Sequence, residues 1–329
     1  MKKLLFIAIF LFSLPFTSDA VLKNYTGFET GDTTEGSTSA GTISVVSTMV
    51  KSGGYALRVN PATTGTGSYN IGSITATGVH DAAAVCGDPC SFGFWFKVDL
   101  LPATADEPIA RINSTSGTSA IVSIDSTGKL GMYDMVAPQT GLGTTTTALS
   151  LNTWYFIEIQ GGDNGATDYG VRINGGTEEI SGNRNFGGNG VFSVSAGKAS
   201  NLNSNSVDFY YDDFYIDDGD YVANAQNAKI IRIVPNEAGD TYSTDWGGTN
   251  CRCFAETSEL PTDGTGTFAS STTSGESFVA FDMQDTHEVG ISGTTTLAVR
   301  AYTRVFERTT GTSVFSAVLL RSGTTNSTT

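Results

Sequence analysis

The chain has 329 residues, of which 16% are charged and 10% are aromatic, and it contains 39 glycines. Its formal net charge of −15 argues against nucleic acid as a partner, because phosphate binding needs a basic patch. The acidity serves solubility or, alternatively, cation binding. Few Lys and Glu residues, together with many Thr, Gly, Phe and Tyr residues, favour strands and turns over helices.

The first 20 residues have the parts of a secretory signal peptide. Lys2 and Lys3 precede an apolar stretch from Leu4 to Phe16, and Ser18-Asp19-Ala20 supplies small residues for cleavage. The apolar stretch is too short to span a membrane, which takes about 20 residues. We therefore predict a signal peptide at residues 1–20 and an extracellular mature protein that has no membrane contact after cleavage.

The mature chain has the period-two pattern of short strands. The clearest strand is Phe92–Val98, whose phenylalanines share one face while Trp95 and Lys97 point the other way. The Ser/Thr/Asn-rich tracts Thr144–Thr147, Asn201–Ser206 and Ser270–Ser274 are expected to be loops. Many short strands without intervening helices predict an antiparallel sandwich. The other expected strands are Tyr55–Val59, Tyr69–Ile74, Ile109–Ile112, Ile121–Ile124, Lys129–Tyr133, Trp154–Ile159, Tyr169–Ile173 and Val207–Ile216.

A change in amino-acid composition at residues 219–228 indicates a connector between two domains. It predicts a first domain at residues 21–222 and a second, smaller β-sandwich domain at residues 223–329. About 100 residues are enough for an independent domain. Strands are expected in this second block at Lys229–Val234, Ser277–Asp282, Thr294–Val305 and Thr312–Leu320.

The four cysteines form two close pairs, Cys86 with Cys90 and Cys251 with Cys253. In an exported chain such pairs predict local disulfides. The loop between Cys86 and Cys90 closes easily, whereas a bridge between Cys251 and Cys253 would be a strained ring. A zinc site is the competing interpretation, but the two pairs lie about 160 residues apart and the chain has only two histidines, His80 and His287. The connectivity stays open.

A set of motifs in the first block resembles laminin-G-like domains of the concanavalin A-like lectin/glucanase superfamily. The resemblance spans roughly residues 25–220 and implies a jelly-roll sandwich whose first and last strands lie side by side. It also implies a role in glycan binding or adhesion. The motifs, in order, are Gly27–Asp32, Ser52–Val59, Phe92–Val98, Leu151–Ile159, Val171–Gly175 and Tyr211–Ile216.

The second block is similar to a module that follows lectin-like domains in tailed-phage structural proteins. The resemblance implies an alternative function, in which the chain is a virion component and its partners are other virion or surface-assembly proteins. It rests on Ile230–Pro235, Asp240–Trp246, Glu256–Pro261, Ser270–Ser274 and Val318–Gly323.

The first resemblance also implies a structural calcium ion. In many lectin-like jelly rolls a glutamate near the first strand and an aspartate on the last strand bracket one ion, and here these positions match Glu29 and either Asp212 or Asp213. Carboxylate oxygens are suitable ligands for calcium. If Tyr210, Phe214 and Ile216 face the core, Asp212 shares that face and is a buried charge that needs a partner. Otherwise both aspartates are solvated at the end of the strand.

Catalysis is not expected. Glycoside hydrolysis needs two carboxyl groups held across a cleft, and the chain lacks the Glu-x-Asp-x-Glu strand motif of the superfamily's glucanases. Glu178 and Glu179 are adjacent and should point to opposite faces of a strand, while Asp217, Asp218 and Asp220 should lie in a turn. A secreted glucanase is therefore the least favoured alternative.

Sugar recognition usually uses an exposed aromatic ring beside a few polar groups. Trp95 is the best candidate, because its strand neighbours point inward while it points outward, and Trp154 is a second candidate on the same reasoning. The alternative is that a loop covers each ring. The sequence as a whole predicts a non-catalytic, exported protein that binds a glycan or a cell surface. It does not identify the glycan.

Overall fold

The computed structural model describes residues 21–29, 31, 33, 37–40, 42–60, 67–73, 90–103, 106–114, 117–135, 140–161, 167–184, 191–198, 207–218, 221, 225–227, 230, 235–242, 279–283, 317–321 and 324–328. Their regular structure consists of strands and one 3-10 turn, η1 (Ala225–Asn227), which confirms the all-β prediction. No helix in this described part is long and apolar enough to cross a membrane. The predicted signal peptide lies outside these residues.

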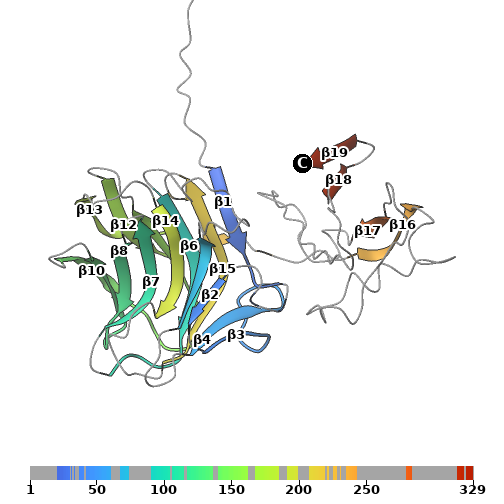
Figure 1. The fold of residues 1–329 in the computed structure, drawn as a ribbon. Helices are drawn as coiled ribbons and strands as arrows, with labels where there is room; N and C mark the ends of the chain where they lie inside the picture. The colour runs from blue at the N-terminus through green and yellow to red at the C-terminus, as the bar shows by residue number, and fades with distance from the viewer. Residues whose placement is uncertain are drawn as a thin grey trace, which may run out of the picture. The chain divides into compact units, whose positions relative to one another are not determined.

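Two antiparallel sheets stack to form a sandwich (Figure 1). The eight-stranded sheet has the order β13 (Glu178–Arg184), β12 (Thr167–Ile173), β11 (Tyr155–Gly161), β6 (Cys90–Val98), β15 (Phe209–Asp218), β4 (Ala56–Asn60) and β3 (Thr42–Val46), with β1 (Val21–Thr26) also paired to β15. The seven-stranded sheet has the order β10 (Thr140–Ala148), β9 (Lys129–Asp134), β8 (Gly117–Ile124), β7 (Glu107–Ser114), β14 (Val191–Lys198), β5 (Gly67–Ser73) and β2 (Ser37–Ala40).

The core between the sheets consists of the inward-facing residues of both. The phenylalanines of β6 pack against β15, where Phe94 stacks on Phe214 with 4.7 Å between the ring centroids and meets Tyr211 at a tilt. Ile112, Val122 and the other apolar residues of β7, β8, β9 and β14 face them from the seven-stranded sheet. β6 is also covered on its other face, where Trp95 is the strand's one residue that is not fully buried.

The first and last strands of the sandwich lie side by side, as the resemblance implied. β1 pairs antiparallel with the second half of β15, from Val21 opposite Asp218 to Thr26 opposite Phe214. β4 pairs with the first half of β15, at Phe209 to Tyr211. Asp212 and Asp213 therefore lie at the gap between two partner strands.

The tract Thr144–Thr147 was expected to be a loop, and that prediction is wrong. It belongs to β10, the edge strand that pairs with β9. Threonine is β-branched and favours strands, but an edge strand with mostly exposed side chains shows no apolar alternation. Thr145 is the buried exception, and its hydroxyl accepts the Leu130 amide at 2.9 Å.

The chain divides into two compact units, Met1–Gln284 and Asp285–Thr329. β16 (Pro235–Tyr242) pairs with β17 (Val279–Met283) in the first unit, and β18 (Ala317–Arg321) pairs with β19 (Thr324–Thr328) in the second. β17 and β18 overlap expected strands. The expected strand Thr294–Val305 and the tracts Asn201–Ser206 and Ser270–Ser274 lie outside the described residues, as does nearly all of Lys229–Val234. The domain boundary near residue 222 stays a prediction.

Candidate functional site

The outer face of the eight-stranded sheet carries the side chains that point away from the core. Trp95 and Lys97 of β6 lie on this face, opposite the buried phenylalanines, as the alternation predicted. The strand register places Phe156 of β11 beside Trp95, and Tyr210 of β15 beside Lys97. The two tryptophans predicted to bind sugar are therefore near neighbours on this face, because Trp154 precedes β11 by one residue.

Trp95 is half-buried and packs against other side chains of the outer face. Its ring lies 5.3 Å from that of Phe156, and both belong to a small cluster with Tyr25, Tyr215 and Ala225. The Lys51 ammonium lies over the Trp95 ring, 3.9 Å from its centroid. A ligand that stacks on this face of the ring would have to replace Lys51.

Trp154 lies at one end of the outer face in a patch with mixed chemistry. The Nζ atom of Lys97 is 5.9 Å from the centroid of the Trp154 ring and 5.6 Å from that of Tyr210. The same atom donates to the Sδ atom of Met49 at 3.1 Å. We call Met49, Lys97, Trp154 and Tyr210 the Trp154 patch. Its two aromatic rings and one cation make it a better platform for a ligand than Trp95.

Exposed leucines lie at the same end of the sandwich. The Asn152 amide donates to the Val98 carbonyl at 2.8 Å, which joins the turn before β11 to the end of β6. Leu151 in that turn and Leu100 after β6 are 44% and 55% exposed. They add apolar surface beside the patch.

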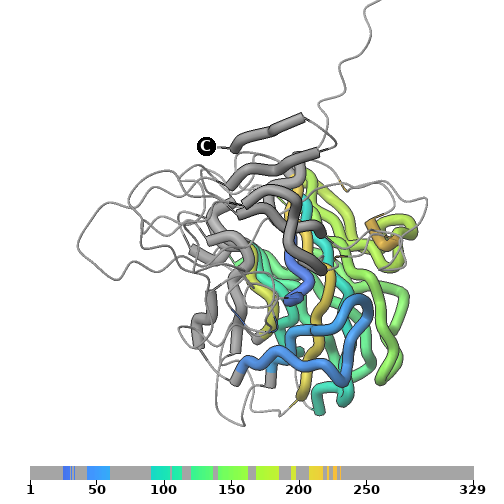
Figure 2. The backbone as a smooth tube through the Cα atoms, turned by 90° about the vertical axis from the view of Figure 1, so that its right-hand side faces the viewer, coloured from blue at the N-terminus to red at the C-terminus, as the bar shows by residue number. Residues whose placement is uncertain are grey.

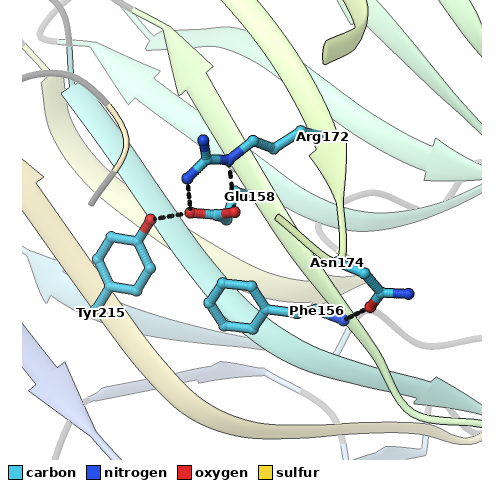
Figure 3. Close-up of polar contacts among 5 residues, drawn as sticks. All are labelled: Phe156, Glu158, Arg172, Asn174 and Tyr215. Carbon is cyan, nitrogen blue, oxygen red and sulfur yellow. Dashed lines mark hydrogen bonds and ion pairs between the residues drawn. The ribbon is translucent and has the colours of Figure 1, made fainter. Parts of the chain in front are cut away.

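A buried ion pair organises the middle of the outer face (Figure 3). Arg172 on β12 donates two hydrogen bonds of 2.6 Å to the Glu158 carboxylate on β11, and Tyr215 donates a third at 2.8 Å. Glu158 is fully buried, so these donors replace the water that the carboxylate loses. Asn174, in the turn that follows β12, accepts the Phe156 amide at 2.9 Å and extends the strand pairing.

Gly93 makes room for this arrangement. It lies between Glu158 and Tyr215 in the strand register, and a Cβ atom there would overlap the Tyr215 ring. The absence of a side chain lets the tyrosine cross β6 and reach Glu158. The sequence placed Gly93 in a strand but contained no signal for this role.

The chain that follows β15 returns over the same face. The Tyr221 ring stacks on the Arg172 guanidinium at 4.1 Å, and Ala225 of η1 packs with Phe156 and Tyr215. Gln226 lies beside Gly175, where the orange turn η1 meets the green strands in Figure 2. Burial and the nearby Glu178 carboxylate raise the pKa of Tyr221 far above its usual range. Part of the predicted connector therefore covers the middle of the outer face, while no described residue of it contacts the Trp154 patch.

The three predicted calcium ligands converge on one loop, Lys51–Tyr55. Glu29 accepts the amides of Gly54 and Tyr55 at 3.0 and 3.3 Å. Asp212 accepts the amides of Lys51 and Ser52 at 2.8 and 3.1 Å. Asp213 accepts the Ser52 hydroxyl and the amide of Ile230, both at 2.7 Å. The loop fills the gap along β15 between β1 and β4.

The strand alternation predicted for β15 is wrong at this point. Asp213 has a φ of 45°, and the pairing with β6 shifts between Asp212 and Tyr215. This bulge brings both Tyr211 and Phe214 to the core, while Tyr210 lies on the outer face beside Lys97. Asp212 is buried, as one alternative predicted. It does not face the core, however, but lies beneath the Lys51–Tyr55 loop.

The electrostatics of Asp212 favour a proton or a cation. Burial, followed by the neighbouring Asp213 carboxylate, raises the pKa of Asp212 to about 8, although the amides of Lys51, Ser52 and Asp213 oppose this shift. The donor set suits calcium, but in the described part of the chain no three acidic, His or Cys side chains converge on one point that could hold a metal ion. The oxygens point instead at amide and hydroxyl donors. Calcium therefore stays a prediction.

The acidic residues considered for catalysis are separated. Glu179 accepts the Thr146 hydroxyl and the Thr147 amide of β10 at 2.8 and 2.7 Å, whereas Glu178 lies beside Gly170 and Tyr221 on the outer face. The two glutamates point in different directions, as predicted. The turn expected at Asp217 and Asp218 is wrong, because β15 continues through both and Asp217 is buried. Asp220 lies outside the described residues.

Of the four cysteines, only Cys90 lies among the described residues. Cys90 is buried at the start of β6 and is disulfide-bonded. Cys86, Cys251 and Cys253 lie outside the described residues. The connectivity of the pairs stays a prediction.

The chain matches no model of a known protein family, and no curated protein sequence is similar to it. Among solved structures it is similar to domain 4 of AbnA, an extracellular GH43 arabinanase from Geobacillus stearothermophilus in complex with arabinotriose. The identity is 16% and the TM-score 0.45, over 63% of this chain and 98% of that one.

Two further solved structures are similar to this chain at about the same level. The carbohydrate esterase of the Shiga toxin-encoding bacteriophage phi24B has 14% identity and a TM-score of 0.44, over 61% of this chain and all of that one (100%). The cellulose induced protein Cip1 has 14% identity and a TM-score of 0.44, over 58% of this chain and 95% of that one. Similarity at this level does not assign a function, so the proposals below rest on the residues of this chain.

Proposed function

We propose that this chain is a non-catalytic, exported glycan-binding protein whose ligand lies on the outer face of the eight-stranded sheet. The observation that carries the proposal is the pair of half-buried tryptophans on that face, each with a lysine beside its ring. A pyranose ring has an apolar face and a rim of hydroxyls, so it suits an aromatic ring flanked by polar groups. The proposal keeps the laminin-G-like interpretation of the first block.

The arrangement of Glu158 supports a binding function over hydrolysis. A glycosidase needs one carboxyl group that can donate a proton and a second that acts as nucleophile or base. Glu158 is occupied by two hydrogen bonds from Arg172 and one from Tyr215. Such a carboxylate is a structural anchor for three strands of the sheet. The virion alternative depends on the second block, most of which lies outside the described residues.

The Trp154→Ala variant should lose glycan binding on an array of polysaccharides, with at least a tenfold weaker Kd for any glycan that the native protein binds. The reason is the loss of the stacking surface, because truncation of an aromatic anchor at a binding hot spot typically costs about 2 kcal/mol or more, or about 30-fold or more in affinity. The turn Trp154 occupies is otherwise made of exposed residues, so the fold should persist. Circular dichroism and the thermal midpoint check this.

Trp95→Ala is the comparison variant. Because Trp95 packs with Phe156 and Tyr215, its loss should lower the thermal midpoint more than the loss of Trp154. If both variants keep full binding, the outer face is not the glycan site. If Trp95→Ala alone abolishes binding while its fold is retained, the site lies at Trp95.

We also propose, on the family resemblance, that calcium binds at Glu29, Asp212 and Asp213, whose carboxylates would have to turn from their present amide and hydroxyl donors toward a shared ion. Addition of EDTA should then lower the thermal midpoint at pH 8, and excess Ca²⁺ should restore it, because an ion that binds only the folded state stabilises it. The Glu29→Gln variant should lose most of this response. An identical thermal midpoint with EDTA and with Ca²⁺ would contradict the calcium proposal and leave the glycan proposal intact.

A further inference from the structure

We propose that the Trp154 patch is a subsite for an acidic sugar. The sugar ring stacks on Trp154, and its carboxylate binds the Lys97 ammonium. The inference rests on the proposed glycan-binding function and names the class of ligand.

The first observation is the state of Lys97. The residue is only 8% exposed, and no carboxylate of the described chain pairs with its ammonium, which contacts two aromatic rings and a thioether. The arginines of the same face differ, because Arg58 pairs with Asp208 and Arg172 pairs with Glu158. A nearly buried cation without an anion is costly, and aromatic faces and a weak sulfur acceptor compensate it only in part.

The second observation is access to the ammonium. Met49 covers Lys97 through its sulfur, and its side chain is 38% exposed in a bend between β3 and β4. Methionine is unbranched and flexible, so its side chain can move aside without disturbing a strand. A carboxylate that enters there replaces the weakest partner of Lys97 with a strong one.

Charge and shape select the occupant. The chain is strongly acidic overall, with a net charge of −15, so an anionic ligand needs a local cation, and Lys97 is the cation of this patch. The Asp208 carboxylate beside Tyr210 is already paired with Arg58. A uronic acid carries its carboxylate on the ring itself, close to the face that stacks on Trp154. Leu151, three residues before Trp154, is an exposed apolar side chain at the same end of the sandwich. A neutral sugar would leave the ammonium unpaired.

The second lysine and tryptophan pair is an internal control. Lys51 lies over Trp95, but the residue is exposed. An ion pair at an exposed lysine contributes little, typically up to about 1 kcal/mol. The acidic ligand should therefore depend on Lys97 and not on Lys51.

The experiment uses matched oligosaccharides. Hexamers of galacturonate, mannuronate and glucuronate, and the carboxyl-reduced form of each, are titrated calorimetrically into the full chain and into Lys97→Met, Lys97→Arg and Lys51→Met. At least one acidic hexamer should bind about 10- to 100-fold more tightly than its reduced form, as expected for a hydrogen-bonded charge pair. Lys97→Met should abolish that preference, whereas Lys97→Arg and Lys51→Met should retain it.

The outcomes separate this inference from the function on which it rests. If the acidic and reduced hexamers bind equally, or if a folded Lys97→Met keeps the preference, the acidic subsite is wrong and the glycan-binding function stands. If the chain binds only neutral glycans on a broad array, the subsite is likewise wrong. If the chain binds no glycan at all, the proposed function fails, and the subsite fails with it.

Discussion

Replacement of Arg172 with methionine should lower the free energy of unfolding by about 3 to 5 kcal/mol, because it leaves the fully buried Glu158 carboxylate without its charged partner. Tyr215 still donates one hydrogen bond, which is too little to replace the two from the guanidinium. Chemical denaturation with urea at pH 7 measures the difference. The loss of the stacking contact between the guanidinium and the Tyr221 ring further lowers the free energy of unfolding.

The matched control is Arg58→Met. Arg58 also forms an ion pair, with Asp208, but its side chain is 36% exposed, and such pairs contribute up to about 1 kcal/mol. The double variant Glu158→Gln/Arg172→Met should recover a large part of the stability lost in Arg172→Met, because it removes the stranded charge. Equal losses in Arg172→Met and Arg58→Met would show that Glu158 does not depend on Arg172.

The stability of the sandwich should fall as the pH rises from about 5 to 8 in the presence of EDTA. Because burial and then Asp213 raise the pKa of Asp212 from 3.8 to about 8, the folded chain keeps a proton in this range that the unfolded chain has released. Stability falls with pH wherever the folded state binds more protons. One proton corresponds to at most about 1.4 kcal/mol per pH unit. Urea unfolding at several pH values measures the slope.

The Asp213→Asn variant tests the cause of this slope. Asparagine tolerates the left-handed conformation that Asp213 adopts, and it removes the neighbouring charge. The pKa of Asp212 should drop, so the loss of stability should end at a lower pH and should be smaller between pH 6 and 8. A slope that is unchanged by Asp213→Asn would mean that Asp213 does not act on Asp212.

Local pattern was enough to predict most of the strands that build the core, although β14, which contributes Val194 and Ala196, was not expected. β6 was predicted in full detail, with its phenylalanines inward and Trp95 outward, because a half-buried strand shows its two faces directly in the sequence. The threonine-rich edge strand β10 was missed, since exposed strands carry no such signal. In β15 a bulge at Asp213 reversed the expected facing of Tyr210.

Side-chain partners were harder to predict than strands. The Glu158–Arg172 pair joins neighbouring strands, and Tyr215 reaches it across Gly93 from a strand more than 50 residues away in the sequence. No local pattern contains these contacts, because they depend on which strands are adjacent. The convergence of Glu29, Asp212 and Asp213 on one loop was expected only through the family resemblance.

By itself, the sequence determined that the chain forms antiparallel layers, and which residues of the clearest strands face inward, because hydrophobic alternation is a local property of each strand. It also determined that Trp95 and Trp154 are outward. Only the tertiary structure decided that Lys51 covers Trp95 and that Lys97 lies between Trp154 and Tyr210 without an acidic partner. The reason is physical: strand order and register set the neighbours of a side chain, and these neighbours set its charge environment and its access to a ligand.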